Sequence, residues 1–193
     1  MPRFASVNED LILEVGGAND IVLERNGVEV DRRGAEGFGK VLQVAYEEDS
    51  GLIGTGSGTI PLDSTTPQNT EGNEILTCSI TPKSSSSYLL ITISTFVGEV
   101  ANLGDWATVA VFRDSGSDAI FSKYTGGSSY AAGGYNGGVF AFTFRVLAGS
   151  TSSTTFKLRA GQDNGSINWN GFGSTNHIGA SNKTSIAIME IAQ

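Results

Sequence analysis

The sequence predicts an all-β protein, a β-sandwich preceded by a short N-terminal arm, and three observations favour this fold class. Apolar and polar residues alternate at period two through Tyr88–Val97 and again in shorter runs after it, as in strands with one buried face. Twenty-six Gly and only two Met in 193 residues indicate turn-rich β structure rather than helix. With 39% hydrophobic and 17% charged residues, the chain is too apolar to be disordered.

Residues 1–37 have a character of their own and predict a β-hairpin arm. The run Asp10–Glu14, DLILE, recurs as Asp20–Glu24, DIVLE, and Asn26-Gly27 then joins two alternating runs, a strong hairpin signal. Short strands of this kind cannot enclose a core alone, so their apolar side chains need partners elsewhere. We expect an arm that interlocks with neighbouring chains or lies on a larger assembly, and the alternative is an added sheet packed on the main domain. The residues expected to make these contacts are Leu11, Leu13, Ile21, Leu23, Val28 and Val30.

Residues 38–193 form the sandwich domain, entered through the Gly-rich linker Arg32–Gly39. Eight strands in a domain of this length are typical of a jelly-roll-like sandwich. They are predicted near Val41–Tyr46, Glu74–Ile80, Tyr88–Val97, Ala107–Arg113, Ala119–Tyr124, Val139–Val146, Thr155–Ala160 and Ser185–Ile191. Three long loops are predicted to lie at the surface, at Asp49–Asn73, Thr125–Gly138 and Gly161–Thr184.

The segment Val139–Val146 is apolar on both of its faces. Phe140, Phe142 and Phe144 alternate on one face, and Val139 and Ala141 add apolar surface to the other. A strand of this composition is expected inside a subunit contact, because a single core covers only one face. The candidates for this interface are Val139, Phe140, Ala141 and Phe142.

No residue pattern predicts catalysis, a cofactor or a metal site, so we expect a non-enzymatic protein. His177 is the only histidine and has no motif that would place a nucleophile or further ligands beside it. Asp114 with Asp118, and Asp163, could supply oxygen ligands to calcium, but no further acidic ligands accompany them. Cys78, the single cysteine, lies among apolar residues at period two and is expected in the core.

Charge and hydropathy exclude two classes of partner. A net charge of −8 argues against nucleic acid, which requires clustered Lys and Arg. No apolar run approaches the roughly 20 residues that span a bilayer, so membrane insertion is not expected. The first residues lack the apolar core of a signal peptide, and a single cysteine fits synthesis in a reducing cytosol.

Aromatic residues in two of the long loops carry a hypothesis of glycan contact. Tyr130 and Tyr135 lie in a Gly- and Ser-rich loop, and Trp169 and Phe172 lie in NGSINWNGFG. Rings flanked by Asn and Ser can stack on sugars while the polar neighbours bind the hydroxyl groups. The alternative is that these rings anchor the loops to the sandwich or fill a subunit contact.

Five motifs, in this order along the chain, resemble a β-sandwich module of tailed-bacteriophage virions, over roughly residues 39–192. They are Lys40–Val44, Ser79–Ser87, Val111–Asp114, Thr155–Ala160 and Ile186–Ile191. The resemblance implies a jelly roll of the tumour-necrosis-factor type and a homotrimer. In that family the module occurs at distal tips of tail fibres and tailspikes and in capsid decoration, or cement, proteins. It implies no catalytic residues.

The short segment before the domain bears on which virion role is expected. A fibre tip normally follows a long shaft, whereas only 37 residues without a heptad pattern precede this domain. If the chain is complete, as its initiating Met suggests, it has no shaft. We therefore expect a decoration protein on the virion surface, made in the host cytoplasm, that binds the major capsid protein and stabilises the assembled capsid by mass action. The alternative is a receptor-binding tip subunit held by another tail protein, and host-surface glycan is a partner in either role.

Overall fold

The computed structural model describes residues 3–5, 12–15, 21–25, 28–33, 39–51, 53–54, 58–99, 106–125, 137–163, 167–171, 175–176 and 178–193. The regular structure of these residues is β-strand, apart from one 3-10 turn, η2 (Ile178–Ala180). The all-β fold class predicted from the sequence is confirmed.

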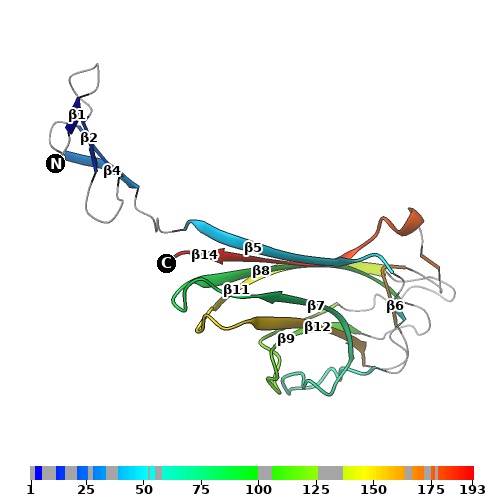
Figure 1. The fold of residues 1–193 in the computed structure, drawn as a ribbon. Helices are drawn as coiled ribbons and strands as arrows, with labels where there is room; N and C mark the ends of the chain where they lie inside the picture. The colour runs from blue at the N-terminus through cyan, green and yellow to red at the C-terminus, as the bar shows by residue number, and fades with distance from the viewer. Residues whose placement is uncertain are drawn as a thin grey trace.

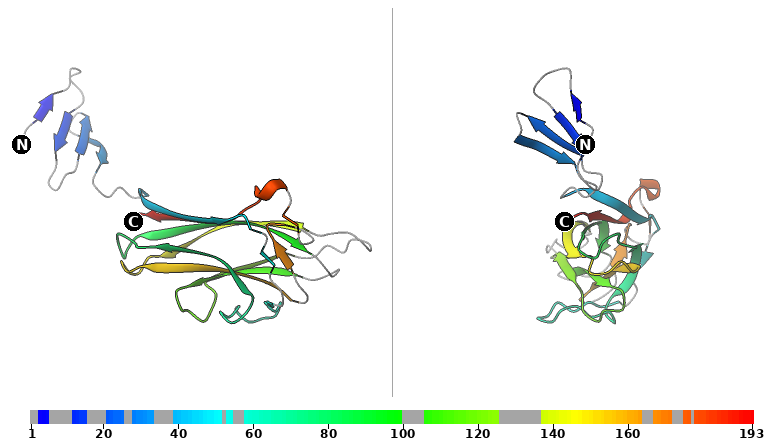
Figure 2. Two further views of the ribbon diagram at one scale, coloured as in Figure 1. Left: turned by 45° about the vertical axis from the view of Figure 1, so that its right-hand side comes forward. Right: turned by 60° about the vertical axis from the view of Figure 1, so that its left-hand side comes forward.

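Two antiparallel sheets packed face to face form the sandwich (Figures 1 and 2). The first sheet contains β5 (Val41–Asp49), β14 (Thr184–Ile191), β8 (Tyr88–Glu99) and β11 (Gly137–Leu147), and the short strands β13 (Ile167–Trp169) and β6 (Ile53–Gly54) extend it beside β8. The second sheet contains β10 (Phe121–Thr125), β9 (Ala107–Arg113), β12 (Thr154–Gln162) and β7 (Asn73–Ile80).

The strand order is that of a jelly roll of the tumour-necrosis-factor type. Numbered along the chain, the eight long strands run 1-8-3-6 across the first sheet and 5-4-7-2 across the second. The chain therefore crosses from one sheet to the other at most of its loops. All eight strands predicted from period-two alternation are confirmed, and their observed ends lie within three residues of the predicted ones.

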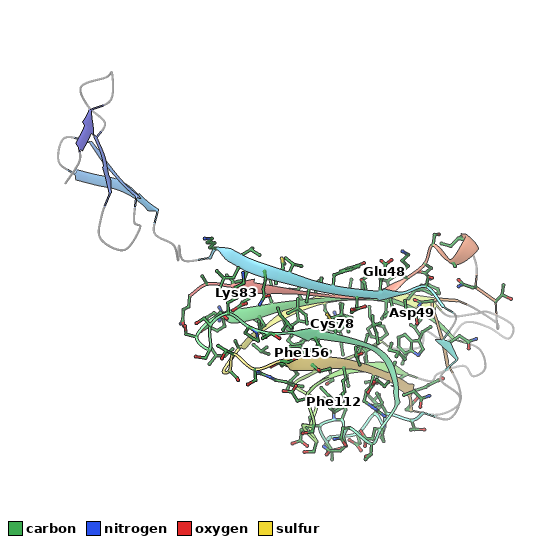
Figure 3. The ribbon with its side chains drawn as sticks, viewed as in Figure 1. Glu48, Asp49, Cys78, Lys83, Phe112 and Phe156 are labelled. Atoms are coloured by element: carbon green, nitrogen blue, oxygen red, sulfur yellow. The ribbon has the colours of Figure 1, made fainter. Side chains whose placement is uncertain are left out.

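The core fills the space between the sheets. The inward residues of β8 are fully buried and meet Phe156 and Leu158 of β12. Figure 3 shows Phe156 and Cys78 between the two layers. Cys78 is 2% exposed, as its apolar neighbours predicted, and burial raises the pKa of its thiol to about 11. The thiol therefore stays protonated and unreactive at neutral pH.

The outer face of the second sheet is covered by residues 58–72, which lie outside any long strand. Ile60 is fully buried there against Ala110 and Phe112, because β9 is apolar on both faces and needs cover on each. Gly72 has a φ of +60°, and a Cβ on it would lie 2.8 Å from the carbonyl oxygen of Ala160. The expectation that Asp49–Asn73 lies wholly at the surface is therefore wrong for this part of the loop.

A buried carboxylate fastens the last strand at the end of the sandwich where β5 begins. Glu190 is fully buried, and its Oε1 accepts hydrogen bonds from the Ser87 hydroxyl at 2.6 Å and the Lys83 amide at 2.8 Å. Its Oε2 accepts one from Nε2 of Gln43 at 2.6 Å. Burial raises the pKa of Glu190, but these bonds and one from the Ser84 amide outweigh it, so the pKa lies below its ordinary value.

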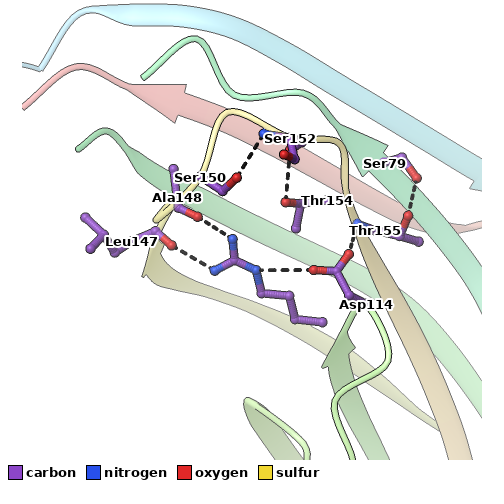
Figure 4. A network of polar contacts seen from close by, with 9 residues as sticks. Ser79, Asp114, Leu147, Ala148, Ser150, Ser152, Thr154 and Thr155 are labelled. Atoms are coloured by element: carbon purple, nitrogen blue, oxygen red, sulfur yellow. Dashed lines mark hydrogen bonds and ion pairs between the residues drawn. The ribbon is translucent and has the colours of Figure 1, made fainter. Parts of the chain in front are cut away.

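A second polar network ties the two sheets together at the same end (Figure 4). Arg113 at the end of β9 donates from Nη1 to the carbonyl of Leu147 at 3.0 Å and from Nη2 to that of Ala148. Asp114 has a left-handed φ of 52° and accepts a hydrogen bond from the Thr155 amide at 2.8 Å. These contacts link the first sheet, through the end of β11, to β9 and β12 of the second.

A third polar cluster holds the opposite end of the sandwich. Asn170 is fully buried with a φ of 62°, and its Nδ2 donates to the carbonyls of Asp49 at 2.9 Å and Gly51 at 3.1 Å. Its Oδ1 accepts a hydrogen bond from the Thr184 hydroxyl at 2.9 Å, and that hydroxyl lies 2.6 Å from the hydroxyl of Thr95.

The N-terminal segment forms a four-stranded antiparallel sheet in the order β1 (Arg3–Ala5), β2 (Ile12–Val15), β3 (Ile21–Arg25) and β4 (Val28–Arg33). Arg25 pairs with Val28, so the hairpin predicted at Asn26-Gly27 is confirmed. The arm sheet has no strand pairing with the sandwich among the described residues, and in Figure 1 it lies beyond the end at which β5 begins.

We expect Glu190→Gln to lower the free energy of unfolding by about 2–4 kcal/mol at pH 7, because an amide cannot accept from donors on both of its sides. Urea unfolding measures the loss, and Glu47→Gln, an exposed carboxylate on β5, is the matched control. Since the pKa of Glu190 is lowered by folding, its contribution is present above its unfolded pKa and is lost as the pH falls through the folded one. The gap between the two proteins should close in acid, and a gap that widens there would contradict this assignment.

Candidate functional site: interaction surfaces

The outward side of the first sheet is an open face with no covering segment among the described residues. The alternation of β14 decides which side chains belong to it, because Ile186 and Ile188 are fully buried toward the core. Across the register, each outward residue of β14 lies beside outward residues of β5 and β8. We define the open face as Val44, Tyr46, Glu48, Ser185, Ala187, Met189, Tyr88, Leu90, Thr92, Ser94, Phe96, Val139, Ala141, Thr143, Arg145 and Leu147.

Large apolar side chains on the open face are exposed to solvent. Val139 is 69% exposed, Val44 59%, Tyr46 53% and Leu147 49%. Small uncharged residues such as Thr92 fill the centre between them. A contiguous exposed apolar face of this kind is typical of an interaction surface.

The charges on the open face are few and each has a partner. The Arg145 guanidinium lies 4.2 Å from the centre of the Tyr88 ring, a cation–π contact. At the other end, Glu48 accepts hydrogen bonds from Lys183 and from the Tyr46 hydroxyl, and these bonds lower the pKa of its carboxyl group. The face can therefore be covered without leaving an isolated charge in an apolar contact.

The four residues expected in a subunit contact are split between the two faces of β11. Val139 and Ala141 lie on the open face and are exposed. Phe140 is only 2% exposed and lies in the core, 6.0 Å from the Trp169 ring, so its proposed availability to a second subunit is wrong. Phe142 is half-buried on the same inward side. The pairing of β11 with β8 directs Phe140 and Phe142 toward the core.

The inward aromatic residues of β11 reach the edge of the sandwich, where they form a stack. Phe121 of β10 lies 4.8 Å from the Phe142 ring and 4.6 Å from the Phe144 ring, nearly parallel to both. Among the strands that the structure describes, β10 pairs only with β9 and β11 only with β8, so within this set each has one unpaired edge. We call Phe121, Phe142 and Phe144 the aromatic edge, and the sequence reasoning did not single out Phe121.

The structure separates the four aromatic residues expected to contact glycan. Trp169 is fully buried in β13, which lies between β8 and β6 in the first sheet. The prediction that it contacts glycan is therefore wrong. Its neighbour Asn170 is also buried, so the Gly161–Thr184 loop is not wholly at the surface as expected. Tyr130, Tyr135 and Phe172 lie outside the described residues.

The arm sheet has one face on which apolar residues gather. Phe4 pairs with Leu13, Leu13 with Leu23, and Val15 with Ile21 in the backbone register, and residues opposite one another share a face. Val28 pairs with Arg25 on that face, whereas a register shift beside Leu23 leaves Val30 without a pairing partner. Of the six expected arm contacts, Leu11 lies outside the described residues. Phe4 was not among them, because the alternation did not predict β1.

The described residues contain no cluster of three or more His, Cys, Asp or Glu side chains that could hold a metal ion. Asp114 instead bonds the Thr155 amide, and Asp163 accepts a hydrogen bond from the Trp106 amide at 2.8 Å. His177 lies outside the described residues. The described residues include no helix that is long and apolar enough to cross a membrane.

No protein-family model and no curated protein sequence matches this chain. Solved structures of infectious bursal disease virus are similar to this chain, but with low TM-scores. The VP2 subviral particle is 11% identical with a TM-score of 0.35 and covers 97% of this chain, and the Gt strain structure is 10% identical with a TM-score of 0.37 and covers 95%. The chain spans about half the length of these structures, 46% and 48% respectively. At these TM-scores the likeness supports no inference about function.

Because Trp169 is fully buried, we expect Trp169→Ala to lower the free energy of unfolding by about 3–5 kcal/mol. Chemical denaturation measures this, and Trp106→Ala is the control of the same chemistry, since Trp106 is only partly buried and should cost less. Equal stability of the Trp169 variant and the unmodified protein would show that the ring is not part of the core.

Proposed function

We propose that this protein is a non-enzymatic structural component of a bacteriophage virion, a homotrimeric decoration protein that binds the assembled capsid and stabilises it. The open face is the observation that carries the homo-oligomer in this proposal, since it exposes a large apolar surface with its few charges already paired. The virion role is supported by the five sequence motifs that resemble phage sandwich modules. The major capsid protein is the partner that this role requires.

The open face is exposed, whereas the rings of the aromatic edge are half-buried against the core and offer a second, smaller apolar contact. Packing of the aromatic edge of one copy on the open face of the next would bury both, and such a heterologous contact closes into a ring when its rotation is a simple fraction of a turn. Three copies related by 120° satisfy that condition. Each contact would bring Phe121 and Phe144 against residues such as Leu90 and Met189.

The arm is assigned to attachment. Its sheet has an apolar face and, among the described residues, pairs with no strand of the sandwich. Burial of a side chain the size of Leu yields about 1.5–3 kcal/mol before the cost of ordering the chain. Three arms on one trimer would multiply that affinity through effective concentration, so a modest contact for each arm suffices.

A receptor-binding tip subunit of a tail fibre or tailspike is the second candidate. It is favoured by the position of two strand ends relative to the arm. The strand ends at Thr125 and Gly137, which flank the loop with Tyr130 and Tyr135, lie at the end opposite Gly39. An attached arm would therefore leave these two strand ends directed away from the particle. Tyr130, Tyr135 and Phe172 remain our proposed contacts to a host-surface glycan.

We expect the protein to have the mass of a trimer by light scattering at micromolar concentration, rather than its monomer mass of 20.1 kDa. Val139→Lys and Val44→Lys should each dissociate it without loss of monomer stability, because both side chains are already exposed in one subunit. Leu62→Lys is the matched control, an apolar residue 42% exposed outside the open face. An intact trimer in both open-face variants would place the interface elsewhere.

Deletion of residues 1–37 should leave a soluble trimer that no longer decorates particles, and Leu13→Asp combined with Leu23→Asp should do nearly the same. Arg3→Asp with Glu14→Lys changes paired positions of the same sheet that lie off the apolar face, and should retain attachment. Cosedimentation with undecorated capsids measures occupancy. Full occupancy of the truncated protein would move the attachment surface to the sandwich.

A further inference from the structure

The second sheet carries a polar pocket of about 320 Å³ on its outward side, away from the open face. Residues of β7, β9 and β12 line its base, and the loop 58–72 and the turn after β9 form its walls. The lining residues are Asn69, Glu74, Phe112, Asp114, Ser115, Lys157 and Arg159. Figure 3 places Phe112 on this outward side of the second sheet, so assembly through the open face would leave the pocket accessible.

Hydrogen bonds to the backbone hold the walls of the pocket in place. Arg159 donates from Nε to the carbonyl of Glu71 at 2.7 Å and from Nη2 to that of Gly72 at 2.6 Å. The Asn69 amide donates to the carbonyl of Ser117 at 2.8 Å, and its Nδ2 donates to that of Gly116 at 3.1 Å. Asp114 is held in its left-handed conformation by the Thr155 amide. A site preformed in this way binds ligand without the cost of ordering its walls.

Other polar groups of the pocket are only weakly engaged within the protein. The Lys157 ammonium lies 3.9 Å from a carboxylate oxygen of Glu74, and both side chains are more than a third exposed. A pair of this kind contributes little and can open to admit a ligand. Lys157 and Arg159 together balance the charges of Glu74 and Asp114, so the pocket offers cations, carboxylates, an amide and a hydroxyl group side by side.

We propose that this pocket binds a carboxylated sugar residue, such as a uronic acid within a saccharide. The carboxylate of the sugar would pair with Lys157, since a charge-assisted hydrogen bond is among the strong polar contacts. The ring hydroxyls would donate to Asp114 and Glu74 and bond with Ser115. A phosphate dianion suits the pocket less well, because its second charge would face those two carboxylates. The pocket shares no lining residue with the open face, the arm or the proposed glycan contacts, so this inference does not depend on the proposed function.

Sodium glucuronate, glucose and inorganic phosphate, each titrated into the full chain, test the proposal by saturation-transfer NMR and calorimetry. Glucuronate should bind in a range of about 1–10 mM, typical of a single sugar residue, and glucose should bind at least about 10-fold more weakly. Lys157→Gln should weaken glucuronate by about 10-fold or more, and Ser115→Ala by less. Lys123→Gln removes an exposed cation of β10 outside the pocket and should change nothing.

Equal affinity for glucose and glucuronate would overturn the role of Lys157, and stronger binding of phosphate would make this a simple anion site. No binding of glucuronate by the unmodified chain would overturn the proposal outright. The unfolding midpoint and the oligomeric mass of the Lys157 variant must match those of the unmodified protein. An affinity lost equally in the Lys123 variant would show a general charge effect and contradict a defined site.

Discussion

The double pairing of β8 is the constraint on which the rest of the structure depends. The strand pairs with β11 along one side and with β14 and β13 along the other. Its inward residues Leu89, Ile91 and Ile93 are fully buried in the core, and its outward residues form the centre of the open face. A slip of one residue in this register would exchange the two sets. One alternation therefore determines both the stability of the subunit and the surface offered for assembly.

Buried or half-buried polar side chains hold loops to strand ends in this protein. Glu190 and Arg113 act at the end where β5 begins, and Asn170 acts at the opposite end. Each uses several hydrogen bonds to backbone groups that would otherwise lack partners once water is excluded. These clusters connect segments far apart in the chain, so they favour one arrangement of the loops rather than adding apolar stability.

The two outward faces of the sandwich differ in chemistry because they are covered differently. The first sheet keeps an apolar, nearly uncharged outer surface that no described segment covers. The second sheet is covered over part of its area by residues 58–72, and the polar pocket lies between this loop, the turn after β9 and Lys157. Under the proposals made above, assembly through the first sheet would therefore leave the outer face of the second sheet accessible to a ligand.

The strands could be predicted from the sequence, because period-two alternation and turn residues are local properties. These signals located all eight long strands, the hairpin at Asn26-Gly27 and the burial of Cys78. Which apolar face of β11 is turned inward depends on its pairing with β8, which places Phe140 in the core and Val139 outside. The tertiary structure likewise buries Trp169 within a segment that resembled a surface loop. Alternation shows that two faces of a strand differ, but pairing with distant strands decides which face meets the core.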